Sequence, residues 1–321
     1  MRFLVSIVCV LLAVGSAVAQ EAYPDRPVRI VVGWAPGGGV DLAARVIARK
    51  LSAKWGQQVF VDNRTGATGL VGDSAVARAA PDGYTLLIAV NAEVTSNPYL
   101  QPDIPKYFEN DLVPVILAYS NPMAVAVNAK GDINSLADLV TRAKEKPGVL
   151  NYATPGTGSI PHLAGALFFD MAGIKLTQIP YRGGAPAATS TAAGDTNVAI
   201  VTTSTVNPFE KSGRLKVLAI TSSSRIASEP SWPTIAELGY PGYEVNLWSG
   251  LFVRKETPAA IVAKLEQDFR AVIADPEVIK QFEGLGAEPS KLSLAQFKSM
   301  IAKEIASYKR IIESTKMQIA K

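Results

Sequence analysis

Short apolar runs alternate along this chain with longer segments whose apolar residues recur at helical spacing. The first part reads as strands over Val28–Val32, Val59–Val61 and Tyr84–Ile88, separated by helices over Asp41–Trp55 and Leu70–Ala79. Continuous short apolar runs predict buried strands, and i, i+3, i+4, i+7 spacing predicts amphipathic helices. A β-α-β-α-β order requires a parallel sheet with helices on both faces, so the expected fold class is α/β.

The same alternation begins again in the middle of the chain. A less regular stretch with three prolines, 97–111, and strands over Val113–Leu117 and Ala124–Val127 come first. The elements predicted after them are a helix over Leu136–Lys146 capped by Ser135, a strand over Leu150–Ala153, a helix over Ser159–Met171, a strand over Leu176–Pro180, a helix over Gly184–Ala193, a strand over Val198–Val201, a helix over Val206–Lys211 and a strand over Leu215–Ile220. An irregular connection, 228–243, a strand over Val245–Val253 and helices over Pro258–Ala274, Pro276–Gly284 and Ser293–Glu313 complete the chain.

Two α/β units followed by a helical tail predict an interrupted domain. We expect residues 23–123 and 245–321 to form one Rossmann-like domain and 124–244 to form the other. Two strands then cross between the lobes and act as a hinge, with a ligand cleft between the domains. This is a two-lobed architecture of two Rossmann-like α/β domains joined by a two-strand hinge.

The first residues have the pattern of a secretory signal peptide rather than of the fold. Arg2 is followed by an apolar run, Phe3–Val14, and by the small-x-small sequence Ala17-Val18-Ala19. We expect residues 1–19 to be removed, with a cut after Ala22 as the alternative, and the mature protein to be periplasmic. A single membrane anchor is the competing interpretation, but the run is short for a bilayer span.

Composition excludes several classes of function. The chain has one cysteine, Cys9, inside the predicted signal peptide, and one histidine, His162. The mature chain of 302 residues therefore has no disulfide and no thiol chemistry, and we expect neither a metal nor a cofactor. Its formal charge is +3 once Arg2 is lost, without the basic block that nucleic-acid binding needs. Mild basicity suits an anionic ligand without requiring one.

Two glycine-rich turns, each after an apolar run and before a helix, are the main candidates for a binding site. The first is Trp34-Ala35-Pro36-Gly37-Gly38-Gly39, and the second is Thr154-Pro155-Gly156-Thr157-Gly158-Ser159 with His162 shortly after. A helix start leaves backbone N–H groups unpaired, and the helix dipole adds partial positive charge there. Two such ends aimed at one cleft would bind a small anion without a catalytic side chain.

Other interpretations of these turns stay open from the residues alone. The first turn matches neither G-x-x-x-x-G-K-[ST] nor G-x-G-x-x-G, which leaves a carboxylate site or a tight turn with a purely structural role. Ser159 and His162 lie three residues apart on one helix face, so a catalytic pair is conceivable. The surrounding sequence is not the G-x-S-x-G elbow of a serine nucleophile, and a capping serine beside a wall histidine is the simpler interpretation.

Several side chains near strand ends have two interpretations each. The aromatic residues Trp34, Tyr181 and Trp248 would either line the cleft or pack in the core. Arg182 would either pair with an anion or stay in solvent.

Taken together, the motifs resemble one family. They are the segments Tyr23–Val32, Ala35–Arg45, Asp62–Gly69, Pro81–Leu87, Thr154–His162, Pro180–Pro186 and Trp248–Gly250. In this order and spacing they resemble the periplasmic solute-binding proteins of tripartite tricarboxylate transporters, the Bordetella uptake gene family. The resemblance covers essentially the whole mature chain.

The resemblance implies a monomeric receptor with the two-lobed, type II periplasmic-binding-protein-like fold, which captures a carboxylate and presents it to integral-membrane transporter subunits. It implies no catalysis. It places the ligand carboxylate on the loops that match Ala35–Gly39 and Thr154–Ser159, with Trp34 beside the ligand. Gly183, Gly184 and Ala185 fall on a third ligand loop.

One departure from the family pattern bears on the ligand. Members that bind amino acids tend to carry an aspartate where this chain has Val201, followed by Thr202. The partner for an amino group is therefore missing, which favours a dicarboxylate, a tricarboxylate or an aromatic acid. Two alternative functions stay open: a solute sensor that presents its ligand to a membrane two-component kinase, and a periplasmic hydrolase or isomerase.

Overall fold

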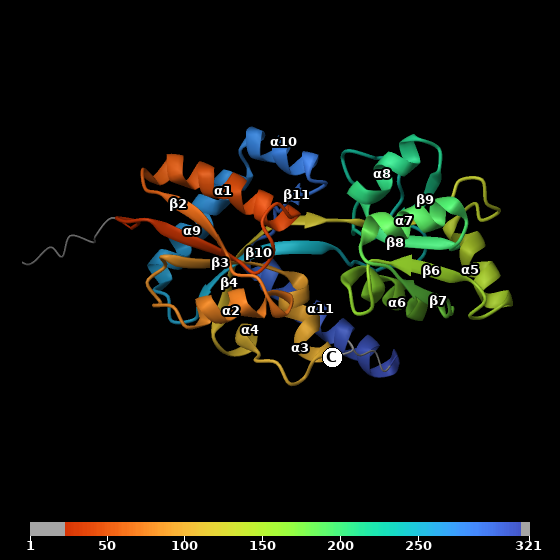
Figure 1. Ribbon diagram of the computed structural model, residues 1–321, viewed down its shortest axis with the longest axis horizontal. Coiled ribbons are helices and arrows are strands. Elements are labelled where there is room, and N and C mark those ends of the chain that lie inside the picture. The colour runs from red at the N-terminus through yellow and green to blue at the C-terminus, as the bar shows by residue number, and fades with distance from the viewer. Residues whose placement is uncertain (1–22, 316–321) are drawn as a thin grey trace, which may run out of the picture.

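The structure, a computed structural model, describes residues 23–315, and the predicted signal peptide lies outside them. Figure 1 shows two lobes side by side along the long axis, each built from a sheet with helices on both faces. The α/β, two-lobed fold expected from the sequence is confirmed.

The first lobe contains a six-stranded sheet in the order β11-β4-β10-β3-β1-β2. Its parallel part is β1, β2 and β3, while β10 pairs antiparallel with both β3 and β4. The strands are β1 (Val28–Val32), β2 (Val59–Asn63), β3 (Thr85–Val90), β4 (Leu112–Asn121), β10 (Leu247–Arg254) and β11 (Glu288–Pro289). The helices are α1 (Gly39–Trp55), η1 (Ala67–Gly69), α2 (Leu70–Ala77), the π-helix η2 (Ala92–Ser96), α3 (Asn97–Leu100), α4 (Tyr107–Asn110), α9 (Ala259–Ile273), α10 (Pro276–Gly284) and α11 (Leu294–Thr315).

The second lobe contains a five-stranded sheet in the order β7-β6-β8-β5-β9. Strands β6, β7 and β8 are parallel, and β5 pairs antiparallel with β8 and β9. The strands are β5 (Met123–Asn128), β6 (Asn151–Thr154), β7 (Thr177–Pro180), β8 (Val198–Thr202) and β9 (Leu215–Ile220). The helices are α5 (Leu136–Glu145), α6 (Ile160–Ala172), α7 (Gly184–Ala193) and α8 (Thr203–Lys211).

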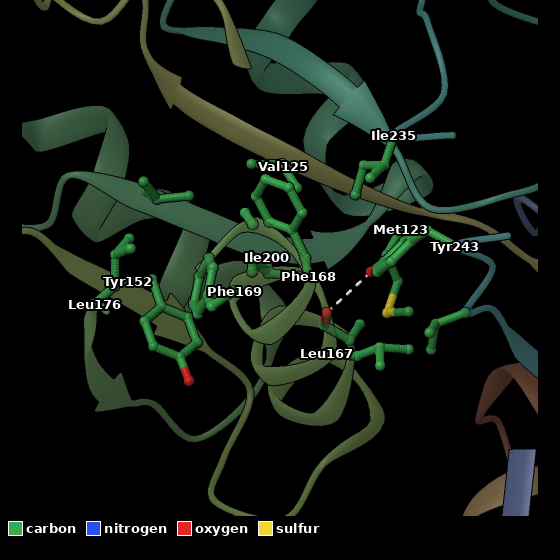
Figure 2. Packing of buried hydrophobic residues seen from close by; sticks show 14 of the residues in the cluster. Met123, Val125, Tyr152, Leu167, Phe168, Phe169, Leu176, Ile200, Ile235 and Tyr243 are labelled. Atoms are coloured by element: carbon green, nitrogen blue, oxygen red, sulfur yellow. Dashed lines mark hydrogen bonds between the residues drawn. The ribbon is translucent and has the colours of Figure 1, made fainter. Parts of the chain in front are cut away.

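Apolar side chains from the sheet and from α6 form the main core of the second lobe. Figure 2 shows the two phenylalanines of α6, with Phe169 beside Tyr152 and Phe168 on the side of Tyr243. The Tyr243 hydroxyl is buried and donates a 2.9 Å hydrogen bond to the Ala164 carbonyl, so the segment before β10 is fixed to α6. Burying one such aromatic side chain stabilises the fold by about 1.5–3 kcal/mol.

The chain crosses between the lobes beside two strand ends. Residue Pro122 separates the end of β4 from the start of β5, and Asn246 lies just before β10. The end of β4 and the start of β10 are paired, because Asn121 lies opposite Leu247. Both crossings therefore leave the first lobe at the same edge of its sheet.

Three elements differ from the sequence expectation. The irregular stretch 97–111 contains the short helices α3 and α4, and β4 continues four residues past Leu117. The two-residue strand β11 pairs with Tyr119 and Ser120, which explains the extension, since it gives β4 a second neighbour. A two-residue strand has no periodicity of its own, so the sequence pattern does not reveal it.

The last helix contacts both lobes. Early in α11, Phe297 packs against Trp248 of the first lobe with a ring separation of 5.2 Å. Later, Tyr308, Ile311 and Ile312 belong to the apolar cluster of the second lobe. Helix α11 is thus a further link between the lobes, in addition to the two crossings.

Candidate ligand-binding site

The strand directions bring the predicted ligand loops to the edges at which the lobes face each other. In the first lobe, β10 enters from the second lobe and is antiparallel to β3, so β3 and the parallel strand β1 end at the facing edge. In the second lobe, β5 enters from the first and is antiparallel to β8, so β8, β6 and β7 also end at the facing edge. Figure 1 shows α1 beginning on the side of its lobe that faces the second lobe.

A buried aspartate holds the first glycine loop in shape. The Asp41 carboxylate, in the first turn of α1, accepts hydrogen bonds of 2.9 Å from the Gly37 N–H, the Arg45 side chain and the Asn63 amide. Asn63 also donates to the Trp34 carbonyl at 3.0 Å. Burial alone would raise the pKa of Asp41, but these hydrogen bonds and the Arg45 charge outweigh it and lower the pKa. The carboxylate is therefore ionised and already satisfied within the protein.

This network decides which amides of the first loop are available. The N–H of Gly37 is bound to Asp41, and that of Gly38 makes a 3.3 Å bond to the Ala35 carbonyl. The first helical hydrogen bond runs from the Leu42 N–H to the Gly38 carbonyl, so the N–H groups of Gly39, Val40 and Asp41 precede it. Residues 35–39 are all exposed.

The second loop uses its serine and histidine internally. Ser159 caps α6, and its hydroxyl donates to the Gly156 carbonyl at 2.7 Å. The Nδ1 atom of His162 accepts a 3.0 Å bond from the Gly158 N–H. The amides of Gly156, Thr157 and Ile160 have no hydrogen-bond partner within residues 23–315.

The environment of His162 argues against a Ser–His catalytic pair. Its side chain is buried, and burial lowers its pKa to about 4, so it is neutral at pH 7. Because Nδ1 accepts a hydrogen bond from the Gly158 N–H, the imidazole proton lies on Nε2. The Ser159 hydroxyl meets the His162 backbone N–H at 3.4 Å rather than its ring.

The remaining predicted residues have mixed exposure. Gly183 and Gly184 are half-buried and Ala185 is exposed, at the start of α7. Thr202 is half-buried, and its hydroxyl lies 2.8 Å from that of Thr205. Val201 is fully buried in the second lobe and Thr154 is fully buried beneath its loop, so only their backbones could reach a ligand.

Of the three aromatic residues that would either line the cleft or pack in the core, one lies in the core and two do not. Trp248 is a core residue, with 2 % of its surface exposed and its indole N–H donating to Glu304 at 2.9 Å. Trp34 and Tyr181 are only half-buried, at the starts of the first and third loops. Arg182 is exposed.

Sequence reasoning missed the residues that support these loops. Gln178 of β7 donates to the Thr154 hydroxyl at 2.8 Å, and its carbonyl oxygen lies 3.4 Å from the Thr157 hydroxyl. Asn63 plays the corresponding part for the first loop. Asp41 carries a signal that could have been used, because an acidic residue in the first helical turn is a common capping choice. Asn63 and Gln178 act from neighbouring strands and have no local signal.

Two buried acids lie behind the first loop. Both carboxyls are 3 % exposed: Asp73 on α2 and Glu93 on η2. Burial raises the pKa of both, and the proximity of Glu93 raises that of Asp73 further. Glu93 accepts from the Val90 N–H at 2.5 Å, and a side chain on Gly33, next to Trp34, would meet its Oε1 at 2.9 Å. Because burial raises both pKa values, negative charge is disfavoured behind the loop.

A groove with a volume of about 1580 Å³ also lies between the lobes. Its walls include β11 and α11 on the first lobe and the start of α8 with residues 223–229 on the second. None of the three glycine loops lines it, so it is distinct from the predicted ligand site. Among the described residues, no cluster of three or more His, Cys, Asp or Glu could hold a metal ion. None of the helices within 23–315 has the length and apolar character needed to cross a bilayer.

A two-lobed α/β fold with glycine loops on facing edges defines a periplasmic binding protein. A family model described as "Tripartite tricarboxylate transporter family receptor" matches residues 43–317. The chain belongs to this family of periplasmic solute-binding receptors.

Curated relatives support the assignment over most of the chain. The chain is 40% identical over 269 residues to the UPF0065 protein in the tcbD-tcbE intergenic region of Pseudomonas sp. strain P51, covering 83% of this chain and 79% of that protein. It is 35% identical to protein BugT of Bordetella pertussis, covering 94% of this chain and 93% of the relative.

Solved structures show the same fold. A TctC solute-binding protein from Polaromonas, without ligand, superposes with a TM-score of 0.84 at 28% identity, covering 91% of this chain and 99% of the other. The R. palustris protein Rpa4515 with adipate superposes with a TM-score of 0.74 at 31% identity, covering 92% of this chain and 99% of the other. MatC from Rhodopseudomonas palustris with bound malate superposes with a TM-score of 0.69 at 26% identity, covering 90% of this chain and 100% of the other.

Replacing His162 will change how the stability of the protein depends on pH. The pKa of His162 is about 4 in the folded protein and about 6.5 in the unfolded chain. Its contribution to the free energy of unfolding is therefore complete above pH 6.5 and is lost as the pH falls towards 4. His162→Asn keeps an acceptor for the Gly158 N–H and cannot titrate here. Urea unfolding at pH 7 and pH 4.5 should show a smaller loss for the variant than for the wild type, and equal losses would contradict the buried neutral imidazole.

Replacing Glu93 will act at the opposite end of the pH range. The pKa of Glu93 in the folded protein lies above the unfolded value of about 4.3. Its contribution to the free energy of unfolding is therefore complete below about pH 4.3 and falls as the pH rises towards the folded pKa. Glu93→Gln removes this titration. We expect the stability of the variant relative to wild type, from urea unfolding, to rise by more than about 1 kcal/mol between pH 5 and pH 8. An unchanged difference would mean that Glu93 is ionised in the folded protein.

Proposed function

We propose that this receptor captures a small carboxylate between its lobes and delivers it to the membrane subunits of a tripartite tricarboxylate-type transporter. The carboxylate would bind at the loops of residues 34–39 and 154–159, through their unpaired N–H groups and those of the helix starts that follow, with Gly183–Ala185, His162, Val201 and Thr202 completing the surroundings. The observation that carries this proposal is that β1, β6, β7 and β8 all end at the facing edges of the lobes.

The moving parts of this proposal are the two domains expected from the sequence. We propose that residues 23–123 with the described part of 245–321 form one rigid unit and 124–244 the other. The β4–β5 and β10 crossings form the hinge, and closure excludes water from the ligand.

The energy of binding requires donors from both lobes. A micromolar ligand needs about −8 kcal/mol. A helix end supplies about 0.3–1 kcal/mol, or about 2 kcal/mol when partly buried. Hydrogen bonds to a charged group add about 1.5–3 kcal/mol each. The open amides of Gly39–Asp41 on one side and of Gly156, Thr157 and Ile160 on the other would reach the required range together.

The proposed ligand class is a dicarboxylate, with tricarboxylates and aromatic acids as close alternatives. Two similar structures hold adipate and malate. The fully buried Val201 offers no charge to an amino group, which disfavours amino acids. The buried acids behind Trp34 are protonated near neutral pH, which suits an anion in front of them.

Isothermal titration calorimetry with a panel of small molecules tests the function. We expect adipate or malate to bind at micromolar or lower concentration, and we expect neither glutamate nor an uncharged sugar to match them. Tight binding of a sugar, or turnover of an acid by the purified protein, would contradict a carboxylate receptor.

A single methyl group on the first loop tests the contact itself. A Cβ on Gly39 would meet no atom within 4 Å, and Gly39 has no left-handed φ, so Gly39→Ala leaves folding intact. We expect its carboxylate affinity to fall at least about tenfold, which is about 1.4 kcal/mol, because the methyl group blocks the approach to the amide.

The matched control is Gly284→Ala on α10, where a Cβ also meets no atom within 4 Å and no left-handed φ is present. It should bind as the wild type does, and thermal unfolding should show both variants folded. Unchanged affinity in Gly39→Ala would remove the first loop from the site.

A further inference from the structure

The two lobes touch beside the hinge, at a glycine of the first lobe that has no room for a side chain. Gly286 lies in the turn between α10 and β11, at a φ of +67°. A Cβ built on it would overlap the Cβ of Ser204 and lie 2.9 Å from its hydroxyl. Ser204 is in the first turn of α8 in the second lobe. The backbone of one lobe therefore rests directly on a side chain of the other.

Gly286 and Thr203, the residue before Ser204, are hydrogen-bonded to the crossing residues. The Asn121 side chain, at the end of β4, donates to the carbonyl of Gly286 at 2.7 Å and to that of Leu285 at 3.3 Å. The Thr203 N–H donates to the carbonyl of Pro122 at 3.0 Å. The contact thus braces the β4–β5 crossing from both sides, and the angle between the lobes cannot change there without disturbing it.

The same contact continues into the proposed ligand site. The Ser204 hydroxyl donates to the Thr202 hydroxyl at 3.1 Å, and Thr202 lies 2.8 Å from the Thr205 hydroxyl. A Cβ on Gly184, at the third glycine loop, would meet the Thr205 hydroxyl at 3.2 Å. A short chain of contacts therefore runs from the first lobe through α8 to a loop proposed to hold the ligand.

We propose that the contact between Ser204 and Gly286 sets the angle between the lobes and thereby selects the length of the dicarboxylate that fits between them. This inference rests on the proposed function. Because the ligand is enclosed between loops of both lobes, the angle between the lobes fixes how much space remains for the part of the ligand beyond the first carboxylate. Ser204 and Gly286 are then specificity-determining residues without touching the ligand.

Three variants test this contact: one that fills the space, a matched control and a double variant that restores the space. Gly286→Asn places a side chain against Ser204, and asparagine tolerates a left-handed φ better than most residues. Gly213→Asn is the matched control, because Gly213 has a φ of +68° and nothing within 4 Å of its Cβ position. The double variant Gly286→Asn with Ser204→Gly restores the space.

The first measurement needs no ligand. Small-angle X-ray scattering of the free proteins should give a changed radius of gyration for Gly286→Asn, with Gly213→Asn unchanged and the double variant returned towards wild type. An unchanged radius in Gly286→Asn, with the variant folded by circular dichroism, would overturn the proposal whatever the protein binds.

The second measurement is calorimetry with straight-chain dicarboxylates from malonate to suberate. In Gly286→Asn the preferred chain length should shift, with at least a tenfold loss for the acid that the wild type prefers, and the double variant should recover the original preference. An equal loss for all lengths, or no recovery in the double variant, would overturn the proposal. If the wild type bound none of these acids, the proposed function would fail, while the scattering result would still decide the contact.

Discussion

The direction of the strands beside the two crossings is the constraint on which the rest of the structure depends. Once β10 runs antiparallel to β3, and β5 antiparallel to β8, the parallel strands of both sheets must end at the interface between the lobes. Loops after parallel strands precede helices, so helix starts gather there as well. The general rule that open α/β sheets bind ligands outside the carboxyl ends of their strands then applies to both lobes at once.

The electrostatics of the site come from the backbone and from groups kept neutral. Burial lowers the pKa of His162, so its imidazole is neutral at pH 7, and burial raises the pKa values of Asp73 and Glu93. Asp41, the ionised acid at the first loop, has its charge satisfied by Arg45, Asn63 and Gly37. What is left for the proposed anionic ligand is a small set of amides at two helix starts, which would bind it without a charged side chain.

Much of the fold could be predicted from the sequence because its strands and helices are periodic. The continuous apolar run predicts the strand Val28–Val32. Apolar residues at helical spacing, followed by Gly56, predict the α1 helix and its end. The position of the glycine loops followed from the same pattern. The internal use of the Gly37 and Gly158 amides could not be predicted, because it depends on where the side chains of Asp41 and His162 turn in three dimensions. The strand β11 and the supporting residues Asn63 and Gln178 exist only through pairing with distant parts of the chain.

Helix α11 imposes a condition on any motion of the two halves. Its beginning packs on Trp248, and its end packs Tyr308, Ile311 and Ile312 into the cluster that includes Leu163 and Leu167 of α6. A rotation about the crossings must therefore slide one apolar surface over another. Closely packed side chains interlock in a few discrete registers rather than in a continuum. If the lobes close as proposed, the change of shape would therefore go in steps, by shear along α11 as well as by bending at the two crossings.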